Sequence, residues 1–255
     1  MTERDLYDAA LIEINKLEAP SMLLEDYNYF INKAIQQYIN KVYNRYEINQ
    51  QATDDLNVLK VNKTLKLTKI VLTIEDKMYF YPSESAATYA KLPEDYMHML
   101  NCIVSFNTAN PDYSGCNGAK DLATAKLARK LTSDIYPSII NNAYFKPSYK
   151  TPYYNIRTVD KSTYDSNQII DILIGDSKFT PTQVDIHYIK KPRKVELTED
   201  MLDGIEDKSS EMEFPDYVCY EIINEFVKLL LENASDPRLQ TNIPINQTII
   251  PQTSE

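Results

Sequence analysis

A long amphipathic segment near the N-terminus, residues 25–46, dominates the pattern of apolar and polar positions. Apolar residues recur there every three or four positions, which is the spacing of one face of an α-helix. These residues are Tyr27, Ile31, Ala34, Ile35, Tyr38, Ile39, Val42 and Tyr46. The opposite face is polar and contains Asn28, Asn32, Gln36, Asn40 and Asn44. The sequence therefore predicts a helix whose Tyr/Ile face packs against other parts of the chain.

Three further segments have the helical spacing of apolar residues: 3–17, 119–136 and 214–232. Pro20 follows the first and Pro137 follows the second, at positions where proline ends a helix. In the second segment the apolar residues four positions apart are Leu127, Leu131 and Ile135. We expect these helices to pack against residues 25–46 in a bundle.

Alternating segments rich in β-branched and aromatic residues predict strands. Residues 61–81 are expected to form two short strands joined by a turn near residues 75–77. After Pro93, one helical turn is expected to lead into an apolar strand, Cys102–Phe106. Two more strands are predicted at Ile169–Ile174 and Gln183–Ile189.

Two polar stretches have no regular period. Residues 146–168 are rich in Pro, Tyr, Ser and Asn, which indicates an extended segment that projects from the fold. Residues 198–213 are strongly acidic and are interpreted as a solvated loop. Residues 47–60 are polar, and their pattern favours neither a helix nor a strand.

The expected fold class is α+β and mainly α: a bundle of about three to four helices with β-strand insertions and an extended C-terminal arm. Residues 1–235 would form a single helical-bundle domain, with the insertions at about 61–81 and 146–197. Residues 236–255 combine spaced isoleucines with prolines. The alternatives are a disordered tail and an arm that docks on a partner by strand addition, and the pattern modestly favours the arm. The candidate docking residues are Pro237, Ile243, Ile245, Ile249 and Ile250.

Composition narrows the functional classes. A hydrophobic share of 43% in 255 residues is enough for a substantial core, and the formal net charge is −10. That charge argues against a protein that clamps nucleic acid, but it suits a pore through which DNA slides without sticking. The charged N-terminus is unlike a signal peptide, and no apolar run approaches the roughly 20 residues of a membrane span. The cysteines, Cys102, Cys116 and Cys219, show neither a disulfide framework nor the spacing of metal ligands.

Catalytic chemistry has little support in the sequence. His98 lies in an apolar, Met-rich stretch and His187 in a predicted strand, so both are interpreted as structural. No nucleophile elbow, P-loop or dinucleotide-binding motif is present, and residues 115–118 are interpreted as a plain turn. The acids Glu199, Asp200, Asp203, Glu206 and Asp207 do not follow the order of an EF-hand loop. The sequence therefore predicts no catalytic, cofactor-binding or metal-binding residue, and no enzyme.

Two further features could bind nucleic acid. The tyrosines of residues 25–46 could stack on bases, although tyrosine at helical spacing is more often part of a core or a subunit interface. The basic run at residues 190–194 is the best candidate for a phosphate contact. It is short and follows a strand, which favours a simple loop or rim charge.

The order of the elements, together with three short motifs, resembles a known family. The motifs are Leu92-Pro93-Glu94-Asp95-Tyr96, Tyr188-Ile189-Lys190-Lys191-Pro192 and Phe214-Pro215-Asp216-Tyr217. Over about residues 3–235 the chain resembles the head-to-tail adaptors of tailed bacteriophages, the podovirus neck proteins also called tail tubular protein A. It is most similar to the ring proteins in the neck of crAss-like phages. Residues 146–168 and 198–213 depart from the family's pattern.

This resemblance implies a structural virion protein that assembles as a homo-oligomeric ring, of about twelve copies, beneath the portal. The ring would connect the portal to the tail, contact other neck or tail rings, and pass double-stranded DNA without binding it specifically. Its place would be the virion neck, after assembly in the host cytoplasm, with no cofactor and no membrane. In such a ring the Asn/Gln face of residues 25–46 would be a candidate for the subunit contact or the channel wall.

Two other hypotheses belong to different classes of protein. The first is a cytosolic module that binds a protein or peptide through the Tyr-rich residues 146–168. The second is a hydrolase that uses His98 or His187 with nearby acids.

Overall fold

The computed structural model divides the chain into two compact units, which we call the helical unit and the β unit. The helical unit comprises residues 1–59 and 192–255, and the β unit comprises residues 60–191. The chain therefore leaves the helices once and returns to them once. The residues that the structure describes are 1–16, 22–69, 88–106, 125–132, 134–135, 138–139, 142, 144–148, 150–158, 168–174, 181–203 and 210–233.

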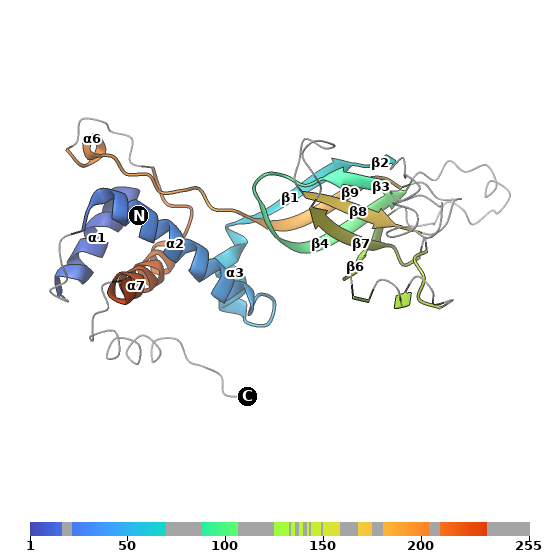
Figure 1. Ribbon diagram of the computed structural model, residues 1–255, viewed down its shortest axis with the longest axis horizontal. Coiled ribbons are helices and arrows are strands. Elements are labelled where there is room, and N and C mark those ends of the chain that lie inside the picture. Colours follow the sequence, from blue (N-terminus) through green and yellow to red (C-terminus); the bar gives the residue numbers. More distant parts are fainter. Residues whose placement is uncertain are drawn as a thin grey trace. The chain divides into compact units, whose positions relative to one another are not determined.

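Within its described residues, the helical unit has three longer helices and two short ones (Figure 1). They are α1 (Glu3–Lys16), α2 (Leu24–Tyr43), α3 (Gln50–Asn57), α6 (Glu199–Leu202) and α7 (Asp216–Asn233). α1 and α2 both pack against α7. The Tyr27 ring joins all three, because it meets Tyr7 of α1 and Phe226 of α7 edge-on at 4.8 and 5.4 Å between ring centroids.

The predicted helices at residues 3–17, 25–46 and 214–232 are confirmed. The Tyr/Ile face of α2 is core: Tyr27, Ile31, Ala34, Ile35, Tyr38 and Ile39 are all buried. α1 begins with a reciprocal cap, since Thr2 Oγ1 accepts from the Asp5 amide and Asp5 Oδ2 accepts from the Thr2 amide. α3 was not predicted, although Asn49 supplies a recognisable cap by accepting a hydrogen bond from the Gln51 amide.

The described residues of the β unit form two sheets. Its strands are β1 (Lys60–Lys66), β2 (Thr68–Lys69), β3 (Thr88–Lys91), β4 (Tyr96–Phe106), β5 (Ala125–Leu127), β6 (Arg129–Lys130), β7 (Tyr153–Thr158), β8 (Gln168–Leu173) and β9 (Pro181–Lys190). One sheet has the order β1-β9-β4-β5 and the other has the order β2-β3-β8-β7-β6. Neighbouring strands are antiparallel, except that β6 and β7 run parallel.

The two sheets pack face to face around one apolar core, as in a β-sandwich (Figure 1). Val104 of β4 and Ile186 of β9 contribute to that core from the first sheet, and Ala90 of β3 and Ile172 of β8 contribute from the second. β8 and β9 confirm the two strands predicted from alternating apolar positions. β1 confirms the first of the two strands predicted within residues 61–81. The predicted turn near residues 75–77 and the second strand lie outside the described residues.

The prediction of a mainly α fold is wrong, because the described strands form a four-stranded and a five-stranded sheet and not small insertions in a bundle. The largest error is the helix predicted at 119–136, where the described residues instead form β5 and β6. Ala128 and Leu131 are buried while Leu127 and Ile135 are exposed, which is not the pattern of one helical face. Pairing of β5 with β4 and of β6 with β7 overrides the helical propensity of these residues.

Three smaller predictions also need correction. No helix forms after Pro93; the amide of Tyr96 closes a single turn on the Pro93 carbonyl and β4 starts at once. The stretch expected to project, residues 146–168, contains β7 with Tyr153 and Tyr154 buried. The acidic stretch expected to be a loop contains α6, capped by Thr198. The assignment of residues 1–235 to one domain stays a prediction, and the arm at 236–255 lies outside the described residues.

Candidate functional site

The most specific polar contact in the helical unit joins α2 to the segment that re-enters this unit, residues 192–198, which we call the return segment. Asn32 Nδ2 donates to the Val195 carbonyl at 2.8 Å, and Asn32 Oδ1 accepts from the Val195 amide at 2.9 Å. One helical turn earlier, Asn28 binds Leu197 in the same two-way manner, at 2.8 and 3.0 Å. The side-chain amides of Asn28 and Asn32 thus satisfy the backbone groups that a neighbouring β-strand would otherwise pair with.

The same segment is anchored by apolar side chains. Val195 is 1% exposed and Leu197 is 3% exposed, and the residues around them, Lys194, Glu196 and Thr198, are exposed. This alternation is that of a strand with one buried face, although the segment has no regular secondary structure. The two asparagines therefore hold an extended peptide in register on a helix.

This arrangement gives Asn28 and Asn32 a role within the chain that the sequence analysis did not predict. Both are half-buried and bind the chain's own backbone. A place for either residue in a subunit contact or a channel wall stays a prediction. Gln36, Asn40 and Asn44 are exposed, and their role in a ring stays a prediction. The i, i+4 spacing of two asparagines beside a buried stripe, with alternating Val195 and Leu197 elsewhere, was the signal in the sequence.

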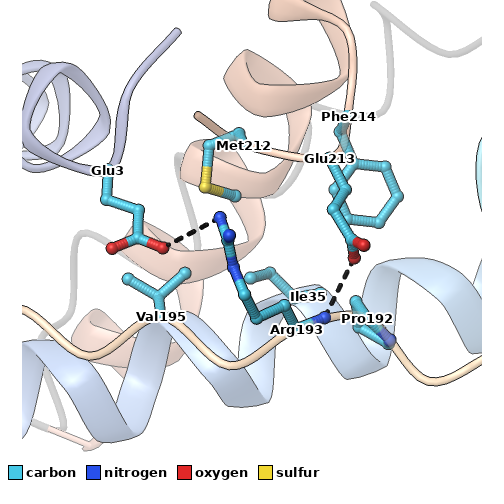
Figure 2. Close-up of a pocket in the computed structure, with 8 residues that line it drawn as sticks. All are labelled: Glu3, Ile35, Pro192, Arg193, Val195, Met212, Glu213 and Phe214. Carbon is cyan, nitrogen blue, oxygen red and sulfur yellow. Dashed lines mark hydrogen bonds and ion pairs between the residues drawn. The ribbon is translucent and has the colours of Figure 1, made fainter. Parts of the chain in front are cut away.

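A small hollow lies where the return segment meets the start of α1 (Figure 2). Its lining residues are Glu3, Ile35, Pro192, Arg193, Val195, Met212, Glu213 and Phe214. The Arg193 guanidinium lies 3.3 Å from Glu3 Oε1 and donates to the Glu211 carbonyl at 2.7 Å. The Arg193 amide donates to Glu213 Oε2 at 2.9 Å. One arginine thus ties the return segment to α1 and to the chain before α7.

The hollow is too small to hold a substrate, and the charged side chains that line it neutralise one another. Its volume is about 10 Å³, room for about one water molecule. Burial raises the pKa of Glu3, and the Arg193 charge acts in the opposite direction. Arg193 was part of the basic run considered for phosphate, but its charge is already opposed by a buried carboxylate. In the β unit, Lys191 of the same run donates to the Glu94 carbonyl at 3.3 Å.

A second polar cluster ties α2, α3 and α7 together around Asp55, which is 4% exposed. Tyr38 donates to Asp55 Oδ2 at 3.1 Å, and Tyr217 donates to Asp55 Oδ1 at 2.8 Å. The hydrogen bond to Asp55, with burial next, raises the pKa of Tyr217 to about 12. Burial, followed by the Asp55 charge, raises the pKa of the neighbouring Glu221. Tyr38 is therefore a core residue with a hydrogen-bonded hydroxyl and does not form a stacking platform.

In the β unit, two of the three motifs that carry the family resemblance contact each other. Tyr188 at the end of β9 donates to Asp95 Oδ1 at 3.0 Å, and its ring lies 5.9 Å from that of Tyr96. The Lys191 amide donates to the Asp95 carbonyl at 2.6 Å. The third motif opens α7: Phe214 is buried, and the Pro215 carbonyl accepts from the first helical amides. All three motifs thus make contacts within the chain that stabilise its fold.

Three of the residues considered for chemistry, His98, Cys102 and His187, lie on the paired strands β4 and β9. His98 is on β4, where burial lowers its pKa, and His187 is on β9 in register with Asn62 and Asn101. Cys102 and Cys219 are free and buried, and burial raises their pKa values to about 12 and 11. Among the described residues no group of His, Cys, Asp and Glu could hold a metal ion.

The remaining candidates are only partly described. Glu199, Asp200 and Asp203 are exposed, whereas Glu206, Asp207 and Cys116 lie outside the described residues. The candidate docking residues Pro237, Ile243, Ile245, Ile249 and Ile250 also lie outside them. No helix within the described part of the chain is long and apolar enough to cross a bilayer.

Comparison with known proteins gives no match: the chain fits no protein-family model, and no curated protein is similar to it.

Proposed function

We propose that this protein is a structural ring protein of a tailed-phage neck, which connects the portal to the tail and lines the DNA channel. In this proposal it has no chemistry of its own, and it acts by burying interfaces with copies of itself, with the portal and with neighbouring rings. It works in the virion neck, where double-stranded DNA passes through its lumen without specific binding. The acidic chain, at a formal charge of −10, suits a channel wall that does not retain DNA.

The observation that carries the proposal is the contact between Asp95 and Tyr188 in the β unit. The motifs Leu92–Tyr96 and Tyr188–Pro192, chosen from the sequence for their family likeness, are 93 residues apart at this contact, yet they meet through a hydroxyl, a backbone amide and two rings. A helical unit interrupted by a β unit is also the order of elements that the resemblance implies. The plan differs in two respects: the sheets are larger, and the described residues of the helix expected at 119–136 form β5 and β6.

The alternative of a cytosolic peptide-binding module receives less support. It relies on the Tyr-rich residues 146–168, but Tyr153 and Tyr154 of that stretch are buried in β7. Buried rings contribute to the core of the β unit and are not available to a peptide.

Electron microscopy of the purified chain, alone and mixed with the portal protein of the same phage, tests the proposal. We expect end-on views with rotational symmetry and a ring that co-purifies with the portal. A chain that stays monomeric at all concentrations and ignores the portal would contradict it.

A further inference from the structure

Formal charge is distributed very unevenly between the two units. Residues 60–191 contain 17 Lys and Arg against 13 Asp and Glu, a formal charge of +4. Residues 1–59 and 192–255 contain 10 Lys and Arg against 24 Asp and Glu, a formal charge of −14. Each copy of the chain therefore offers a positive and a negative body, which attract each other when they belong to different copies.

Three of the positive charges of the β unit lie on one strand, β1. This strand is the edge of its sheet, because among the described residues it pairs with β9 alone. Lys60, Lys63 and Lys66 are all exposed on it, while Val61 and Leu65 pack against the core. None of these three lysines forms an ion pair within the described part of the chain. The edge thus presents three unneutralised cations along seven residues.

The placement of lysines on β1 also disfavours one kind of partner, the β1 strand of a second copy. Lys63 lies on the same side of the strand as Val61 and Leu65, so it places a charge where an added strand would bury an apolar residue. If two copies paired through β1, the lysines of both would face one another across the new ladder. Like charges directly opposite are unfavourable, so a two-fold β1–β1 contact is disfavoured. The edge fits an unlike, acidic surface.

We infer that the lysine edge of β1 is the contact by which one copy binds the acidic helical unit of the next copy. This inference rests on the proposed ring, and it specifies which surface of one copy contacts which unit of the next copy. A positive body that meets a negative body is a head-to-tail contact, and repeated head-to-tail contacts form a ring when the rotation from copy to copy closes. Double-stranded DNA is the competing occupant, but a formal charge of +4 over 132 residues is small for a surface that binds a polyanion.

The test compares two matched double substitutions in the full chain. Lys63→Glu with Lys66→Glu reverses two charges on the β1 edge. Lys146→Glu with Lys150→Glu reverses two exposed charges elsewhere in the β unit. Analytical ultracentrifugation gives the concentration at which each variant assembles, at about 50 mM and about 500 mM salt. Circular dichroism and thermal unfolding check that both variants fold.

We expect the β1 variant to need at least about tenfold more protein to assemble than the control variant, and we expect high salt to reduce this difference. Equal assembly of the two variants would overturn the inference and leave the proposed ring intact. If the β1 variant assembles normally but loses DNA binding that the natural chain has, the edge binds nucleic acid and the inference fails. A natural chain that never assembles, even with the portal, contradicts the proposed function itself.

Cross-linking of the natural chain provides a measurement that needs no variant. A carbodiimide joins lysine amines directly to carboxylates, and a mixture of isotopically light and heavy chains identifies links between copies. We expect Lys60, Lys63 or Lys66 to be linked to acids of the helical unit in another copy. Links from these lysines that occur only within one copy would overturn the inference.

Discussion

Asn32 binds both polar groups of the Val195 backbone: its amide nitrogen donates to the carbonyl at 2.8 Å and its amide oxygen accepts from the amide at 2.9 Å. The two residues are 163 positions apart in the sequence. Because Val195 itself is buried, its backbone groups have limited access to water. This contact, repeated by Asn28 and Leu197, closes the helical unit after the chain has passed through the β unit.

Asn32→Ala should destabilise the helical unit. The substitution leaves the amide and the carbonyl of Val195 without partners, and half-buried groups of this kind cost about 1–3 kcal/mol when they lose their hydrogen bonds. Denaturant unfolding followed by circular dichroism measures the change in free energy. Asn40→Ala is the matched control, because Asn40 is an exposed asparagine on the same helix and should change stability by no more than about 0.5 kcal/mol. Equal stability of the two variants would show that the Asn32 contact contributes nothing.

Asp55→Asn should also lower the free energy of unfolding. The carboxylate accepts from both Tyr38 and Tyr217, and an amide in its place offers one oxygen acceptor, so one hydroxyl loses its partner. We expect a loss of about 1–3 kcal/mol in the free energy of unfolding. The control is Asp54→Asn, the same change at the exposed neighbouring position, with an expected effect within about 0.5 kcal/mol. A loss as large at Asp54 as at Asp55 would argue against a special role for the cluster.

Glu221→Gln should stabilise the protein at neutral pH. Burial and then the Asp55 charge raise the pKa of Glu221 above its ordinary value of 4.5, while Tyr38 and Lys41 act in the opposite direction. Between pH 4.5 and that raised pKa the folded state binds more protons than the unfolded state, so stability falls as pH rises through this window. A glutamine at this position stays neutral at every pH, so the variant does not lose this stability as the pH rises.

Unfolding free energies at pH 7 and pH 4 test this prediction about Glu221. The stabilisation should be present at pH 7 and should shrink at pH 4, where the natural carboxyl is protonated in both states. Glu225→Gln is a control of opposite sign, because Glu225 pairs with Lys41 and its loss should remove up to about 1 kcal/mol. A Glu221→Gln variant that is less stable than the natural chain at pH 7 would contradict the argument.

Removal of residues 236–255 should weaken binding to the portal by at least about tenfold, equivalent to about 1.4 kcal/mol. The reason is the loss of the spaced apolar residues that an extended arm would bury on its partner. Biolayer interferometry against immobilised portal measures the dissociation constant. Replacement of Ile243, Ile245, Ile249 and Ile250 by Ser should reproduce the loss, and replacement of the arm's Gln and Thr residues by Ser should not. An unchanged dissociation constant after truncation would remove the arm from the interface.

Local patterns in the sequence were sufficient to predict a helix or a strand wherever that element has a single buried face. The three- and four-residue spacing of Tyr27, Ile31 and Tyr38 determined α2 and its core side, because burial of a helical stripe depends only on residues within that helix. The alternation in residues 183–189 determined β9 in the same way. The absence of familiar catalytic motifs was likewise visible from the residues alone.

Partners far apart in the sequence were decided only by the tertiary structure. Residues 125–130 have the composition of a helix but pair with β4 and β7, since backbone hydrogen bonds to existing strands outweigh a propensity of tenths of a kcal/mol per residue. The sequence analysis predicted Asn28 and Asn32 as candidates for a subunit contact or a channel wall. Only the structure shows that they bind backbone groups of the return segment, 169 and 163 residues away. The sequence by itself thus determined which faces are apolar. The fold decided which polar groups are satisfied within the chain, because a hydrogen bond requires a partner at about 3 Å and no local pattern specifies that partner.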